Sequence, residues 1–201
     1  MRLGNSYAVE FKNATGASII PGVLVMYSGD DLCSGAGTVV TRDISAIDPA
    51  GSLGAVRMSF TAPATGANTY FRAKLVNAGS AIPLSFSWSD TTMFSPAWSD
   101  NGTFDTFYSF LNTTGTTLNG TLTLLSPAGA VVKTLNVVIP AGQAVGTNTS
   151  SLGIARNQTG TARFRHDGPP GAIVAEAAIA NFSINPAYVQ PVKFQAMREA
   201  R

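Results

Sequence analysis

Apolar and polar residues alternate over short runs along most of the chain, and Gly, Pro and Asn separate the runs. The clearest case is LTLLSPAGAVVKTLNVVI, residues 122–139. Alternation continues up to Leu125, Ser-Pro-Ala-Gly supplies a tight turn, and a run rich in Val, Leu and Ile follows. This pattern predicts a β-hairpin, and repeated strands with this punctuation predict an antiparallel β-sandwich.

Two stretches also fit a helix by propensity. IVAEAAIANF, residues 173–182, is rich in alanine, and QAMREAR, residues 195–201, ends the chain. The segment YFRAKLVN, residues 70–77, answers the first of them in the repeat described below and alternates cleanly. We therefore expect strands at both places, with a helical turn or a frayed end over the last six residues.

The chain repeats itself in a loose way. YAVEFKNATGAS near the start and FYSFLNTTGTTL near the middle both lead with an aromatic strand pattern and continue into Asn-x-Thr-Gly. Five pairs of segments match in the same order: 7–18 with 107–118, 22–31 with 120–129, 47–60 with 139–145 and 160–168, 69–79 with 172–183, and 82–88 with 190–197. Shared order predicts two copies, 5–100 and 101–201, the second with a short C-terminal tail.

Composition favours the same fold class and narrows the function. Charged residues make up 12% of the 201 residues, about half the usual share of roughly 25%. The polar surface must then come from Ser, Thr, Asn and Gly, which suit strands and loops. A net charge of +2 with scattered basic residues argues against nucleic-acid binding. No apolar run reaches the roughly 18 residues of a membrane span.

The second copy resembles the immunoglobulin-like repeats of secreted and surface proteins of bacteria. The resemblance rests on TFYSFLN (106–112), GTLTLLSPAG (120–129), VVKTLNVVIPAG (131–142) and GAIVAEAAIANF (171–182), and it covers most of 105–185. It implies two tandem immunoglobulin-like antiparallel β-sandwich domains in a secreted protein that spaces, displays or adheres, with no catalytic site. Because MRLGNSYAVEF lacks the apolar core of a signal peptide, either the protein is cytoplasmic or an export signal has been removed, and the resemblance favours the second, with an extracellular or cell-surface location.

Residues for catalysis are scarce. The chain has one His, His166, and one Cys, Cys33, so an ordinary zinc site is nearly excluded. A Ser-His-Asp site is disfavoured because Asp167 follows His166 directly, and neighbours on a strand point to opposite faces. We expect His166 to lie in a loop beside the Gly-Pro-Pro-Gly turn, and we expect no enzyme activity and no cofactor other than calcium.

The stretch 86–110 contains both tryptophans and several further aromatic residues. One hypothesis is a glycan-binding platform made by Trp88, Trp98, Phe94, Asp90 and Asp100. The alternative is that these aromatic side chains fill the cores. Trp98 follows Pro96, so it is the ring that we expect to be most exposed. In SDNGTFD, the oxygen ligands Asp100, Asn101 and Asp105 surround a glycine and form a candidate calcium site.

Two functions from different classes follow. The first is a non-catalytic structural or adhesive protein whose partners are itself or neighbouring surface domains, joined through edge strands. NSYAVEF (5–11) and VKFQAMREA (192–200) are the strands that we expect to be exchanged. The second is a carbohydrate-binding module that uses the aromatic residues of 86–110.

Overall fold

The fold is all-β, as the alternation predicts. The computed structural model describes residues 4–13, 22–28, 38–43, 55–61, 69–75 and 84–196. Within these ranges the chain forms antiparallel strand pairs and one 3₁₀ helix, η1, and it contains no α-helix. None of the described helical segments is long and apolar enough to cross a membrane. The Met197–Arg201 end, where a helical turn was an alternative, lies outside the described residues.

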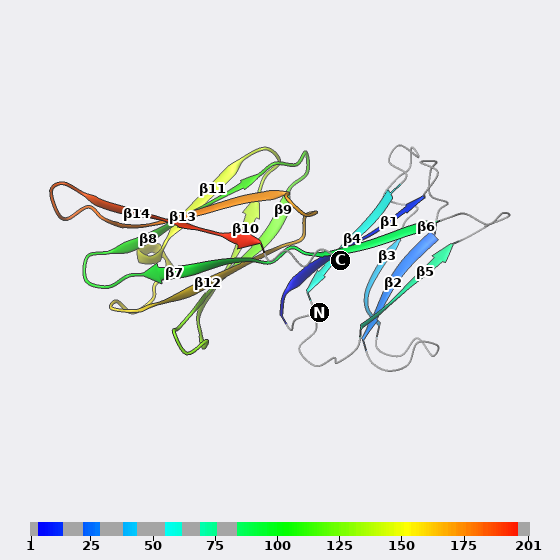
Figure 1. Cartoon of the computed structure of the whole chain (residues 1–201), viewed down its shortest axis with the longest axis horizontal. Coiled ribbons are helices and arrows are strands. Elements are labelled where there is room, and N and C mark those ends of the chain that lie inside the picture. The colour runs from blue at the N-terminus through cyan, green and yellow to red at the C-terminus, as the bar shows by residue number, and fades with distance from the viewer. Residues whose placement is uncertain are drawn as a thin grey trace. The chain divides into compact units, whose positions relative to one another are not determined.

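The elements in chain order are β1 Ser6–Asn13, β2 Gly22–Ser28, β3 Thr38–Asp43, β4 Ala55–Thr61, β5 Thr69–Leu75, β6 Leu84–Asp90, β7 Met93–Ser99, β8 Asp105–Asn112, β9 Leu118–Leu125, β10 Val131–Ile139, β11 Ala144–Asn148, η1 Thr149–Leu152, β12 Thr159–His166, β13 Ile173–Asn181, β14 Tyr188–Lys193 and β15 Gln195–Ala196 (Figure 1).

The chain divides into two compact units, and the second begins at Asp90. The sequence places the start of the second copy at residue 101, after the aromatic stretch. Strand β7 accounts for the difference, because it pairs with β12 through contacts such as Phe94 opposite Arg163. The stretch 93–99 therefore belongs to the second unit.

The first unit contains two three-stranded sheets, with strand orders β4-β1-β6 and β3-β2-β5. Strand β1 is central in its sheet, and its Tyr7 and Val9 side chains are fully buried. The ring of Tyr7 lies 5.8 Å from that of Trp88 on β6. Tyr7 of the alternating β1 pattern is thus a core residue of this unit, in agreement with one of the two sequence interpretations.

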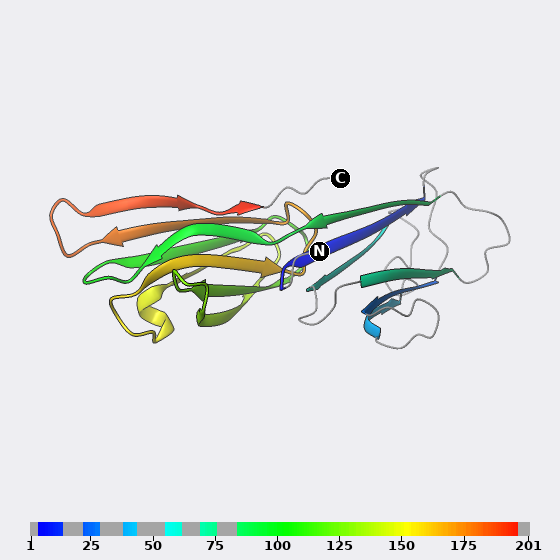
Figure 2. The ribbon, with the colours of Figure 1, turned by 60° about the horizontal axis from the view of Figure 1, so that its bottom comes forward.

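The second unit is a sandwich of a five-stranded sheet, β10-β9-β12-β7-β15, and a four-stranded sheet, β11-β8-β13-β14 (Figure 2). Alternate residues of β8 and β12 point into one common core. At its centre, the Phe110 and Phe164 rings stack with centroids 4.0 Å apart. Leu122, Leu124 and Ile139 are likewise almost completely buried.

The two units share a strand order. β1 lies between β4 and β6 as β8 lies between β11 and β13, and β2 lies between β3 and β5 as β9 lies between β10 and β12. Strands β1 to β6 therefore correspond in sequence order to β8 to β13. This corrects two segment matches made from sequence: β5 corresponds to β12 rather than to 172–183, and β6 corresponds to β13 rather than to 190–197.

The hairpin predicted over 122–139 is confirmed. Strands β9 and β10 pair antiparallel, with Leu122 opposite Leu135. In the turn, the Gly129 amide donates to the Ser126 carbonyl at 2.9 Å, and Gly129 has a φ of 82°, a conformation that favours glycine. The alanine-rich stretch 173–182 is also strand over Ile173–Asn181. Burial of Ile173, Ala175 and Ala177 against the core outweighs its helix propensity.

Candidate interaction site

Trp98 is not a surface residue, so the expectation that it is the most exposed ring is wrong. Its side chain is 1% exposed, and its Nε1 donates to the Leu125 carbonyl at 2.9 Å. Pro96 does not start a loop. It lies in β7 where the register with β12 shifts, and such a bulge tolerates proline. The face of this indole is therefore closed to a sugar ring.

The other residues of the expected glycan platform have separate roles. Phe94 is half-buried opposite Arg163 in the five-stranded sheet, while Trp88 is half-buried in the first unit. Asp90 is buried, and its Oδ1 accepts a hydrogen bond from the Thr92 amide at 2.9 Å. These contacts explain the side chains as parts of the two units, in line with the structural alternative for the aromatic stretch.

The three residues of the candidate calcium site are already held by protein groups or turned to solvent. Asp100 is fully buried; its Oδ1 accepts from the Gln158 amide at 2.7 Å, while its Oδ2 has no hydrogen-bond partner among the described residues. Asp105 Oδ1 accepts from the Arg156 guanidinium at 2.6 Å, and Asn101 is exposed. Among the described residues, no three His, Cys, Asp or Glu side chains gather as metal ligands would. The Arg156 guanidinium neutralises the charge of the Asp105 carboxylate, in the place that a calcium ion would take.

His166 ends strand β12 instead of lying in a loop, which corrects the sequence interpretation. It continues the inward-pointing series of Ala162 and Phe164 and is 5% exposed. Burial lowers the pKa of His166 to about 4, an effect that the neighbouring Asp167 only partly offsets. The Asp167 carboxylate instead accepts hydrogen bonds from Asn119, at 2.8 and 2.9 Å. His166 is thus a neutral core residue at pH 7.

The two segments expected to exchange between subunits are both held in sheets of their own chain. Residues 5–11 form most of β1, which has a neighbour on each side. Residues 192–196 contain the end of β14 and all of β15, and β15 pairs with β7. An exchange would have to break these pairings.

Strands β10 and β14 are edge strands of the second unit, and they differ in how well they are protected against pairing with another chain. β14 carries Pro191 and Lys193, the two residue types that blunt a sheet edge. β10 has nine residues, contains no proline, and carries one charge, Lys133, next to an irregularity in its register. Within the described residues it pairs only with β9. We call Thr134–Val138 the open run, because the Ile139 carbonyl already accepts from Asn112 Nδ2 at 3.0 Å.

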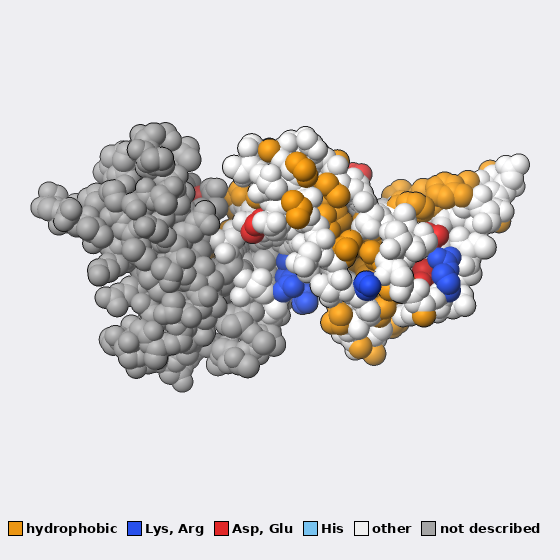
Figure 3. All heavy atoms as spheres, turned by 180° about the vertical axis from the view of Figure 1, so that it is seen from behind, with side chains coloured by type: hydrophobic (Ala, Val, Ile, Leu, Met, Phe, Trp, Pro, Cys, Tyr) orange, Lys and Arg blue, Asp and Glu red, His pale blue; other side chains and the backbone are white. Residues whose placement is uncertain are grey.

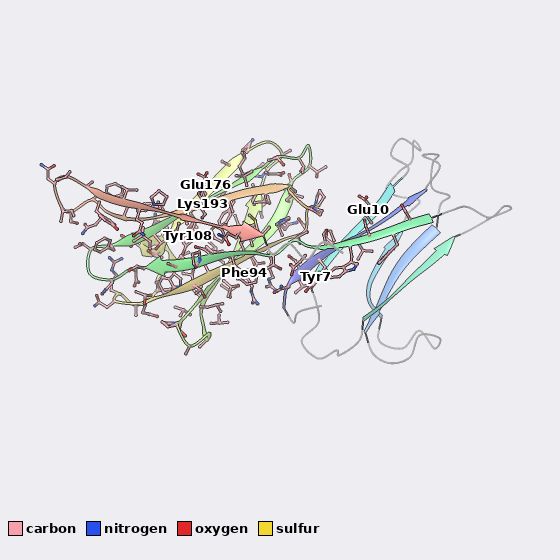
Figure 4. All side chains as sticks on the ribbon, in the orientation of Figure 1. Tyr7, Glu10, Phe94, Tyr108, Glu176 and Lys193 are labelled. Carbon is pink, nitrogen blue, oxygen red and sulfur yellow. The ribbon has the colours of Figure 1, made fainter. Side chains whose placement is uncertain are left out.

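A second surface feature is the outer face of the four-stranded sheet β11-β8-β13-β14, which we call the outer face. Five of the ten large hydrophobic side chains that are exposed lie on this face: Phe107, Leu111, Val174 and Val189 at outward positions of the sheet, and Phe182 against the ring of Phe107. Figure 3 shows hydrophobic side chains along the projecting hairpin that β13 and β14 form. Glu176 and Lys193 lie among them on neighbouring strands (Figure 4).

No family model and no curated protein matches this chain. Among solved structures it is similar to Thermotoga maritima 1070, with 15% identity and a TM-score of 0.46 over 55% of this chain and 97% of that chain. Two structures of infectious bursal disease virus, of the Gx strain and of the VP2 subviral particle, have TM-scores of 0.23 and 0.24 and identities of 11% and 12%. They cover 96% and 95% of this chain and 61% of each of theirs.

Proposed function

We propose that the protein is a non-catalytic structural subunit, made of two tandem immunoglobulin-like sandwiches, that joins neighbouring copies by pairing β10 with β10. The observation that carries the proposal is the open run Thr134–Val138 on a long edge strand. The common strand order of β1–β6 and β8–β13 supports an origin by duplication. We include in the proposal an extracellular or cell-surface location, which the resemblance of residues 105–185 implies.

An open edge has a defined kind of partner. Its unpaired N–H and C=O groups can be satisfied by an extended strand laid alongside, and each hydrogen bond contributes about 0.5–1.5 kcal/mol. The sequence VVKTLNVVI has high strand propensity and a single charge, which favours such pairing over solvation.

The open run is also compatible with itself. An antiparallel pair centred on Asn136 would set Thr134 opposite Val138 and Leu135 opposite Val137. Lys133 would then face Ile139 of the other copy, so no like charges would be opposed. Cross-strand pairs of branched apolar side chains stabilise a sheet, and like charges directly opposite each other destabilise it. A second copy is therefore a suitable partner strand.

Hydrogen exchange tests the edge directly. As the protein concentration rises, the amides of 134–138 should exchange more slowly, while those of the already paired β12 should not change. Val138→Lys should abolish the concentration dependence, because a lysine on an edge opposes pairing. Val138 is 60% exposed, so the fold should tolerate the change.

The matched control is Thr161→Lys, at an exposed position of the interior strand β12, which should behave as the original protein. If β10 amide exchange does not depend on concentration in the original protein, the proposal is wrong.

A further inference from the structure

The outer face carries a pair of opposite charges within an apolar surface. Glu176 on β13 and Lys193 on β14 are directly opposite in the strand register, and both are exposed. They form no hydrogen bond or ion pair with each other or with another described residue. Exposed apolar or small residues flank them, with Val174 on one side and Pro191 on the other. A partner that covered this face would have to satisfy both charges, because burying an unpaired charge is costly.

The arrangement of the two charges specifies a partner. A twofold axis that runs along the strands, midway between β13 and β14, exchanges the positions of the two strands. Glu176 of each copy then lies over Lys193 of the other. An axis perpendicular to the strands at that level would instead oppose Glu176 to Glu176 and is disfavoured. Packed sheets lie about 10 Å apart, a gap that a glutamate and a lysine side chain can bridge.

We infer that the β13–β14 part of the outer face binds a second copy of the chain face to face, with reciprocal ion pairs between Glu176 and Lys193. This surface is separate from the β10 edge, so the inference goes beyond the proposed function. Ala178 would face Pro191 of the other copy, because these two residues are directly opposite in the β13–β14 register. The contact thus combines burial of apolar side chains with complementary charges, which favour a second copy of the same chain as the partner.

The position of the axis sets the size of the contact. Because the axis lies between β13 and β14, it sets only these two strands of each copy over each other, and β8 and β11 lie outside the overlap. Strand β13 has nine residues, which at about 3.4 Å each make the overlap about 30 Å long, and two strands about 4.8 Å apart make it about 10 Å wide. The flat footprint of about 300 Å² per copy is smaller than the roughly 800 Å² per partner of a standard interface, so the contact is a weak one.

A charge-reversal cycle tests the inference. Glu176→Lys and Lys193→Glu should each weaken dimerisation at least about tenfold, because either change opposes like charges twice in the symmetric contact. The double variant Glu176→Lys/Lys193→Glu should restore the dissociation constant to within about threefold, and isotope-mixed cross-linking distinguishes this rescue between copies from one within a single chain. Sedimentation equilibrium measures the constant. All proteins carry Val138→Lys, which removes the β10 contact, so this inference can fail without the proposed function failing.

Zero-length carbodiimide cross-linking of a mixture of ¹⁴N- and ¹⁵N-labelled protein gives a second readout. The expected product is a peptide pair that joins Glu176 of one isotope to Lys193 of the other. Each single reversal sets like charges opposite each other within one sheet, at a cost of roughly 0.2–1 kcal/mol, so both single variants should melt within about 8 °C of the parent and remain folded. The inference is overturned if the Val138→Lys protein is a monomer at all concentrations, if the double reversal fails to restore the dimer, or if all cross-links join chains of one isotope.

Discussion

Gly160 is the position where the smallest side chain should matter most. It lies opposite Trp98 where the pairing of β12 with β7 changes register. A Cβ added there would overlap the Leu125 carbonyl oxygen and lie 2.9 Å from Trp98 Nε1. These are the two atoms that share the buried indole hydrogen bond. Gly160→Ala must therefore displace either the β9 backbone or the largest side chain in the core.

Two terms make up the cost of Gly160→Ala. Overpacking a close-packed site costs about 1–3 kcal/mol, and a buried indole N–H left without its acceptor costs about 1–3 kcal/mol. Removing a glycine from a strand returns about 0.5–1 kcal/mol. The net loss in the free energy of unfolding is about 1–5 kcal/mol, with about 3 kcal/mol as the central value. For a domain of this size that corresponds to a fall in Tm of roughly 10 °C or more.

The assay uses Trp98 itself as the probe. The chain has two tryptophans, so a Trp88→Phe background leaves Trp98 as the sole one, and its fluorescence follows unfolding of the second unit. Gly115→Ala is the matched control, because a Cβ there meets nothing within 4 Å, and its Tm should change by less than about 2 °C. If Gly160→Ala melts within about 3 °C of that control, the close approach of β9, β12 and Trp98 is refuted.

Two further predictions concern the core of the second unit. The pKa of His166 is lowered to about 4 in the folded chain, so on acidification the unfolded chain binds the proton first. The free energy of unfolding therefore falls by about 3 kcal/mol in total as the pH drops from about 6.5 to 4. His166→Phe should remove much of this loss, seen as a smaller difference in Tm between pH 7.5 and 4.5; an unchanged difference would contradict it. Phe110→Ala, which removes a fully buried ring stacked on Phe164, should cost about 3–5 kcal/mol in urea denaturation, and a cost below 1 kcal/mol would contradict the packing.

The sequence predicted best where one signal dominates the local structure. The 122–139 hairpin combines alternation with a Ser-Pro-Ala-Gly turn, and both are local properties. Burial also explains why residues 173–181 form the strand β13 and not a helix. Alanine favours a helix, but the alternating small residues of this segment suit a strand that packs on a core. The two units share a strand order, but the last two segments of the predicted repeat were matched to the wrong strands, since which strands are neighbours is a long-range property that short phrases do not encode.

The candidate sites were harder to predict because each depends on contacts distant in sequence. Trp98 is buried, and its indole N–H donates to the Leu125 carbonyl, 27 residues away in sequence. Pro96, which is close in sequence, wrongly indicated a loop. Asp105 is neutralised by Arg156, 51 residues away. Whether β10 or β1 is an edge depends on the whole sheet order. An unprotected run such as VVKTLNVVI can be noticed in the sequence, but only the topology shows that its outer side is open.

The two contacts inferred for the second unit lie on different sheets, and this determines the form of the assembly. A symmetric contact uses the same surface on both copies, so either contact alone closes into a dimer. Both contacts together leave one free surface at each end, and copies add until a ring closes or a filament forms. Val138→Lys and Glu176→Lys should each leave a dimer in sedimentation velocity, and the combined variant should be a monomer. If one variant alone reduces the original assembly to monomers, a single surface makes every contact, and the two-contact scheme is wrong.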